Sequence, residues 1–128
     1  MTQFTLVFAA AFGMLAIILG AFGAHALKKI LNEEQLKSFE TGVKYQMYHA
    51  IVLLLLGFQL EFTQPIENYI VYSFIGGIIL FSFSIYGLVI ASNKNTKLRF
   101  LGPITPLGGL LLTIGWGLFL YYAITTLS

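Results

Sequence analysis

The sequence contains no cysteine, and it has few charged residues for its length. Without cysteine, the chain can form no disulfide, no thiolate nucleophile and no thiolate metal site. Only 9% of its 128 residues are charged, whereas soluble domains average about 25%. A chain that is 58% hydrophobic cannot cover a water-facing surface with so little charge. The composition predicts an integral membrane protein with a single domain over residues 1–128. We expect no cofactor and no nucleic-acid partner.

Basic side chains are absent from both ends of the chain and from the connection near residue 63. All seven lie either between the first and second apolar stretches or between the third and fourth: Lys28, Lys29, Lys37, Lys44, Lys94, Lys97 and Arg99. Short loops that carry Lys and Arg stay on the cytoplasmic side of a membrane. We therefore expect a multi-pass protein of the cytoplasmic cell membrane, with both termini and the 63–68 turn outside.

The apolar stretches cover about residues 4–24, 45–62, 69–91 and 106–127, and they predict helices over about residues 4–24, 33–62, 66–91 and 104–127. At about 1.5 Å per residue, the first of them reaches about 31 Å, which matches a bilayer core of about 30 Å. Asn32 followed by Gln35 is typical of a helix start, so the second helix is expected to begin in a cytoplasmic extension. The predicted fold class is an all-α membrane protein with four transmembrane helices in an antiparallel bundle.

Small residues recur at four-residue spacing on three of these stretches. They are Ala9–Gly13 with Ala16–Gly20–Ala24, then Ser73–Gly77, and finally Gly109–Thr113–Gly117. Helix association in lipid depends on close packing, so these stripes are expected to be the faces where helices approach. The first stripe predicts an interface within the bundle or between protomers. Trp116 lies too deep for either interfacial belt, so we expect it inside the bundle.

Polar residues gather near the predicted cytoplasmic face and form the first candidate site: His25, Glu40, Tyr45, Gln46 and His49. Ionisable groups at membrane depth are costly and often functional, so a pair of histidines at one depth could handle protons or a small molecule. The competing interpretation is that these side chains hydrogen-bond neighbouring helices. Two histidines without a third ligand are a weak signal for a metal or haem, so no metal site is predicted.

The string GPITPLGG at residues 102–109 contributes to the second candidate site. Its prolines interrupt a helix, so Thr105 is expected to cap the last helix and Pro106 to take its first position. Free N–H groups at a helix start favour an anion. The candidate lipid-headgroup or anion site is Lys94, Lys97, Arg99, Gly102 and Thr105. The alternative is a plain turn whose basic residues only set the topology.

Three long motifs and a dipeptide identify a family. The chain has GAFGAHAL at 20–27, FETGVKYQMYHA at 39–50, GPITPLGG at 102–109, and Gly115-Trp116. These closely resemble a widespread family of small four-helix membrane proteins, the domain of unknown function four-two-three, and the resemblance covers nearly the whole chain. It implies the fold and the membrane location, but no activity and no catalytic residues. Phe83 stands where the family pattern has a small glycine, so close packing of the third helix is in question there.

No catalytic arrangement stands out, so the leading interpretation is non-enzymatic. We expect a structural, assembly or regulatory membrane component that contacts membrane lipids and forms a homo-oligomer or joins other membrane proteins. The alternative is a protein that handles lipid, a small molecule or protons through the His/Tyr cluster and the 102–109 segment. A small multidrug-type exporter would need a buried acidic residue in the first helix, and that helix has none.

Overall fold

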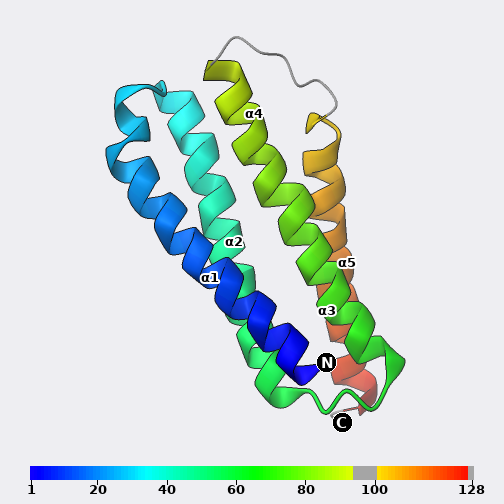
Figure 1. Cartoon of the computed structure of the whole chain (residues 1–128). Coiled ribbons are helices and arrows are strands. Elements are labelled where there is room, and N and C mark those ends of the chain that lie inside the picture. The colour runs from blue at the N-terminus through cyan, green and yellow to red at the C-terminus, as the bar shows by residue number, and fades with distance from the viewer. Residues whose placement is uncertain (94–100, 127–128) are drawn as a thin grey trace.

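The computed structural model describes residues 1–93 and 101–126, and these residues are helical with short connections. The elements in chain order are α1 (Thr2–His25), the 3₁₀ turn η1 (Leu27–Lys29), α2 (Glu33–Gln59), α3 (Pro65–Ile78), the π-helical turn η2 (Ile79–Phe83), α4 (Ser84–Asn93) and α5 (Ile104–Thr126). The segments α3, η2 and α4 form one continuous rod (Figure 1). The all-α class is therefore confirmed.

Three segments are long and apolar enough to cross a membrane: Thr2–Lys29, Pro65–Ser92 and Ile104–Thr126. They correspond to α1, the α3–η2–α4 rod and α5. The helix α2 has 27 residues but falls outside this group, because polar side chains interrupt its apolar sequence between residues 44 and 49. Three of the four long helices thus have the composition of membrane spans in their own right.

The helices α1 and α2 pack antiparallel along their length. Near the start of α1, Leu6 lies against Gly57 of α2, where an added Cβ would approach the Leu6 side chain to 2.6 Å. Near the end of α1, a Cβ on Gly23 would meet the Phe39 ring at 2.8 Å. Contacts at both ends of the pair fix which levels of α1 and α2 face each other.

The small-residue stripe predicted on the first helix forms part of this interface. Ala9 and Ala16 are buried. Gly20 faces Val43, and a Cβ added to Gly20 would lie 3.4 Å from Val43 Cγ1. Ala24 is exposed instead, and Gly23 makes the close contact at that end. The prediction of a helix interface within the bundle is confirmed, with its last position shifted by one residue.

The ends of α2 and α3 follow the expected capping chemistry. Asn32 Oδ1 accepts from the Gln35 amide at 2.8 Å, and Gln35 Oε1 accepts from the Asn32 amide at 3.1 Å, so the predicted capping box is confirmed. The second helix ends at Gln59, before the predicted residue 62, because the following backbone is extended and Phe62 adopts a positive φ of 56°. Pro65 then begins α3, as expected of a residue without an N–H.

The rod widens into a π-helical turn at η2, where α5 comes closest to it. An added Cβ on Gly108 of α5 would lie 2.2 Å from the Phe81 nitrogen and 2.6 Å from the Leu80 carbonyl carbon. Only a glycine allows this backbone-to-backbone approach. The irregularity falls on the segment containing Phe83, where the sequence put close packing in question.

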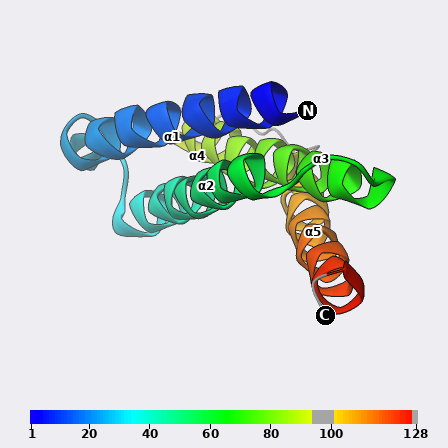
Figure 2. The same cartoon turned by 90° about the horizontal axis from the view of Figure 1, so that it is seen from below.

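The face of α5 that packs on the rod contains Gly108 and Gly115, and the Phe74 ring covers Gly115. The stripe predicted from the sequence, Gly109–Thr113–Gly117, points elsewhere: Thr113 is exposed and nothing lies within 4 Å of a Cβ at Gly117. Seen from below, α5 leans away from α1 and α2 (Figure 2), and it packs mainly on α3 and η2. One edge of α5 is therefore left open.

We expect Gly108→Ala to destabilise the fold, because its Cβ collides with backbone that cannot rotate away. A cost of about 1–3 kcal/mol is typical of such overpacking. The matched control is Gly13→Ala, whose Cβ would meet only the Ala50 Cβ at 4.0 Å. Unfolding by sodium dodecyl sulfate in mixed micelles measures both variants. Equal stability of the two variants would contradict the close approach at η2.

Candidate functional site

A polar network holds three segments together near the middle of α2. Gln46 is fully buried; its Nε2 donates to the Phe12 carbonyl of α1 at 2.8 Å, and its Oε1 accepts from the Tyr86 hydroxyl of α4 at 2.7 Å. The Ser82 hydroxyl of η2 donates to the Gly42 carbonyl at 2.7 Å. These bonds use both ends of the amide, so Gln46 ties α1, α2 and α4 to one another.

His49 joins α2 to α5 beside this network. Its Nδ1 lies 2.8 Å from the Tyr45 carbonyl, and Trp116 Nε1 lies 3.2 Å from its Nε2. An indole N–H can only donate, so Nε2 accepts and the ring proton belongs on Nδ1. The ring also packs against Phe74 at a centroid distance of 5.5 Å. Both nitrogens of a neutral His49 are therefore occupied by the protein itself.

Trp116 was expected inside the bundle, and this prediction is only half right. The residue is 47% exposed on the open edge of α5, but its N–H points inward to His49. Its ring packs edge-on against Phe74 at 5.4 Å. The aromatic ring can face lipid while its one polar atom is bonded, as amphipathic side chains usually do.

The structure does not bring His25 and His49 to one depth, so that prediction is wrong. His25 is exposed at the end of α1, just beyond Gly23. Gly23 contacts Phe39, His25 lies two residues beyond Gly23, and His49 lies ten residues along α2 in the other direction. The two histidines are therefore separated by about 18 Å along the helix axis. The chain reverses direction at η1, between the two histidines, so the number of residues between them does not indicate their relative depth.

Of the other members of the first candidate site, Glu40 and Tyr45 are exposed and only Gln46 joins the network. The partners of Gln46 and His49 come from distant segments, and the sequence did not pair them. Ser82 and Tyr86 are four residues apart on one helical face, which is the sequence signal of a polar helix contact. No group of three or more His, Cys, Asp or Glu side chains within the described ranges could hold a metal ion.

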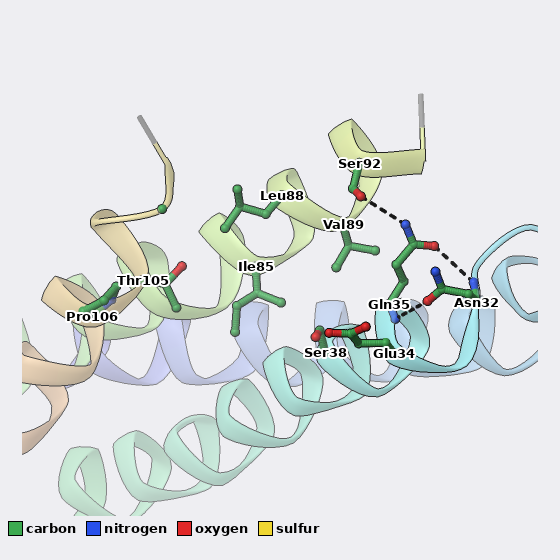
Figure 3. A pocket seen from close by; sticks show the side chains of 11 residues that line it. Asn32, Glu34, Gln35, Ser38, Ile85, Leu88, Val89, Ser92, Thr105 and Pro106 are labelled. Carbon is green, nitrogen blue, oxygen red and sulfur yellow. Dashed lines mark hydrogen bonds between the residues drawn. The ribbon is translucent and has the colours of Figure 1, made fainter. Parts of the chain in front are cut away.

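A second arrangement lies at the end of the molecule that contains the start of α2. A cavity of about 560 Å³ opens where α2, α4 and the start of α5 meet (Figure 3). One wall is polar and comes from the first turns of α2, and the facing wall is largely apolar and comes from α4. The lining residues are Asn32, Glu34, Gln35, Ser38, Ile85, Leu88, Val89, Ser92, Gly102, Thr105 and Pro106.

The amide of Gln35 closes one side of this cavity. Its Nε2 donates to the Ser92 hydroxyl at 3.1 Å, while its Oε1 completes the capping box at Asn32. Figure 3 shows this chain of bonds running from Asn32 to Ser92. The side chain that starts α2 thus also fixes the end of α4, and the two helices cannot separate there without breaking this bond.

Thr105 lines the cavity but does not cap α5, so its predicted role is wrong. The helix begins at Ile104, and the Thr105 hydroxyl is bonded to the Ser84 hydroxyl. Ser84 Oγ donates to the Phe81 carbonyl at 2.9 Å, so Thr105 must be the donor to Ser84. Pro106 falls in the first turn of α5, one of the few helical positions that tolerate proline.

The predicted anion site is represented here only by Gly102 and Thr105, which both line the cavity. Lys94, Lys97 and Arg99 lie outside the described residues, so the anion site stays a prediction. The described lining adds a group that the prediction did not include, the carboxylate of Glu34. A cavity with a carboxylate on one wall is not suited to an anion alone.

The sequence also missed a buried carboxylate at the opposite end of the molecule. Glu67 is 1% exposed; its Oε2 accepts from the Gln64 amide at 2.8 Å and its Oε1 from the Tyr122 hydroxyl of α5 at 3.1 Å. The first turn of a helix favours a negative charge. Beside it, Asn68 Oδ1 is buried with no hydrogen-bond partner in the described structure. Glu67 thereby anchors the end of α5 to the start of α3.

Long apolar helices that turn their polar side chains toward one another define an integral membrane protein. The chain belongs to a family of proteins of unknown function (DUF423), whose profile matches residues 19–109. The family resemblance of the sequence motifs is therefore confirmed.

Several relatives are named as membrane proteins. A UPF0382 membrane protein of Staphylococcus aureus is 41% identical over 103 residues, covering 80% of each chain. The UPF0382 membrane protein YwdK of Bacillus subtilis is 39% identical over 105 residues, covering 80% of this chain and 81% of the relative. The UPF0382 inner membrane protein YgdD of Escherichia coli K12 is 36% identical over 124 residues, covering 96% and 91%. No solved structure gives a significant match.

We expect Gln46→Leu and Tyr86→Phe each to destabilise the protein by about 1–2 kcal/mol, because each leaves a buried polar group without its partner. The double variant should cost less than the sum, since it removes both unpaired groups. Unfolding in mixed micelles gives the coupling energy. Gln46→Leu with Tyr122→Phe, whose hydroxyl bonds Glu67 at the other end, is the control and should be additive. Additivity in both pairs would contradict the network.

Proposed function

We propose that this chain is a non-enzymatic membrane component with four transmembrane helices in an antiparallel arrangement, and that it acts by self-association. In this proposal α2 is the fourth span. Its polar side chains Gln46 and His49 are buried against other helices. These two residues lower the mean hydropathy of α2, but they would not contact lipid. A helix that crosses the membrane back after α1 would pack antiparallel to α1, as α2 does. The α2 extension beyond α1 would then amount to about one turn.

The orientation we propose has both termini outside. The start of α1, the α2–α3 connection and the end of α5 lie at one end of the molecule (Figure 1). Lys28, Lys29 and Lys37 belong to the other end, where α1 stops and α2 begins. The charge distribution favours that end as the cytoplasmic one.

A non-enzymatic role is supported by how the polar residues of the helix interior are used. Gln46, Ser82, Tyr86 and His49 each bond another part of the chain. A catalytic base must be within reach of a substrate proton, but the ring nitrogens of His49 are both taken. The structural interpretation of the polar cluster is therefore favoured over proton or small-molecule handling.

Self-association is supported by the open edge of α5. The stripe Gly109–Thr113–Gly117 lies on this edge. Thr113 and Gly117 are exposed, and no atom of another part of the described chain lies within 4 Å of a Cβ added to Gly117. Small residues at four-residue spacing let two helices approach closely in lipid. Since the stripe is not covered by this chain, we propose that the α5 stripe of a second copy packs on it in a symmetric pair.

Single cysteines give a direct test of the orientation, because the chain contains none of its own. We expect Thr63→Cys and Thr126→Cys to react with a membrane-impermeant maleimide on intact cells. Ala26→Cys should react only after the membrane is permeabilised. All three positions are exposed, so differences in labelling report sidedness. Reaction of Ala26→Cys on intact cells would refute the proposed topology.

Native mass spectrometry of the purified protein tests self-association. We expect a dimer or larger oligomer for the natural sequence and a monomer for Gly117→Leu, because a large side chain keeps the two α5 helices apart. Ala21→Leu makes a comparable change at an exposed position of α1 and should leave the oligomer intact. A monomeric natural protein, or equal effects of the two substitutions, would overturn the proposal.

A further inference from the structure

The cavity between α2, α4 and α5 has the size of a ligand site. Its volume of about 560 Å³ lies within the range of about 300–1,000 Å³ that is usual for small-molecule pockets. Three separate segments supply its walls, and the Gln35–Ser92 bond fixes two of them relative to each other. It is therefore a built feature of the fold rather than a gap at one helix end.

The α2 wall offers a carboxylate with a hydroxyl beside it. Glu34 and Ser38 are four residues apart, so both project from one face of α2, and both line the cavity (Figure 3). Both side chains are exposed, and neither makes a hydrogen bond within the described residues, unlike the neighbouring Asn32 and Gln35. This wall suits a group with several N–H donors and a positive charge, such as a primary ammonium.

The α4 wall is apolar. Ile85 and Leu88 are half-buried and Val89 is buried, and all three line the cavity. An occupant that combines an ammonium head with hydrocarbon would find a polar surface on α2 and an apolar one on α4.

The start of α5 provides the third wall, with opposite polarity to Glu34. Gly102, Thr105 and Pro106 line it, and the positive end of the helix dipole at a helix start attracts negative charge. The cavity thus has a carboxylate on one wall and the positive end of a helix dipole on another. A headgroup that carries both an ammonium and a phosphate matches this pair, whereas a purely anionic headgroup would meet the Glu34 carboxylate.

We propose that this cavity binds the headgroup of a phospholipid that carries a primary ammonium, of the phosphatidylethanolamine type. The ammonium lies between Glu34 and Ser38, the phosphate faces the first turn of α5, and the glycerol end rests on Ile85 and Leu88. The proposed position is at the cytoplasmic surface, where a headgroup of the inner leaflet is available. This inference does not depend on the proposed self-association, and only the choice of leaflet rests on the proposed orientation.

The choice among lipids tests the proposal. The purified protein is mixed with equal amounts of phosphatidylethanolamine, phosphatidylcholine and phosphatidylglycerol of identical acyl chains, and native mass spectrometry records what is retained. We expect preferential retention of phosphatidylethanolamine, because the methylated ammonium of phosphatidylcholine has no N–H to donate and phosphatidylglycerol has no positive charge. Equal retention of all three lipids, or preference for phosphatidylglycerol, would overturn the proposal.

The variant Glu34→Gln tests whether phosphatidylethanolamine is retained in this cavity. It should lower phosphatidylethanolamine retention by about tenfold, the equivalent of losing one charge-assisted hydrogen bond. Glu33→Gln is the matched control, because it makes the same charge change one residue away in the same helical turn, outside the cavity lining. Leu88→Trp, which fills the cavity, should also lower retention. Equal effects of the two glutamine substitutions would show that general surface charge, not this cavity, holds the lipid.

Discussion

The relative positions of α1, α2 and α4 depend on the amide of Gln46. A polar side chain inside an apolar bundle must find partners within the protein, and this one bonds a carbonyl of α1 and the hydroxyl of Tyr86 on α4. Because Gln46 itself belongs to α2, its two bonds define the relative positions of three segments. The surrounding contacts of Phe12, Leu53 and Ile78 are apolar and non-directional, whereas the hydrogen bonds of the amide require defined donor and acceptor positions.

The same requirement explains why α2 looks unlike its neighbours in composition. Two of its polar side chains, Gln46 and His49, are buried against other helices, while the apolar Ile51, Leu54 and Leu55 are exposed. An average over the whole helix counts the two buried polar residues and so underestimates how apolar the exposed surface of its second half is.

Much of the fold could be predicted from the sequence, because its signals are local. Asn32 with Gln35 marks a helix start wherever it occurs, and Pro65 marks another. The site depends on which helices meet, and a local pattern cannot give that. The rotation of α5 brought Gly108 rather than Gly109 to the rod, the reversal at η1 separated His25 from His49, and Thr105 found Ser84 instead of its own helix end. Each error came from a contact between residues far apart in the chain.

The π-helical turn has a consequence for the two halves of the rod. A π turn accommodates one residue more than an α turn, which rotates everything after it by about 100° relative to an uninterrupted α-helix. Phe74 and Tyr86 are twelve residues apart, so an uninterrupted α-helix would place them about 120° apart around its axis, and one extra residue reduces this angle to about 20°. Both side chains thereby reach α2, Phe74 at His49 and Tyr86 at Gln46. The extra residue therefore acts as a phase shift that keeps both halves of the rod facing α2.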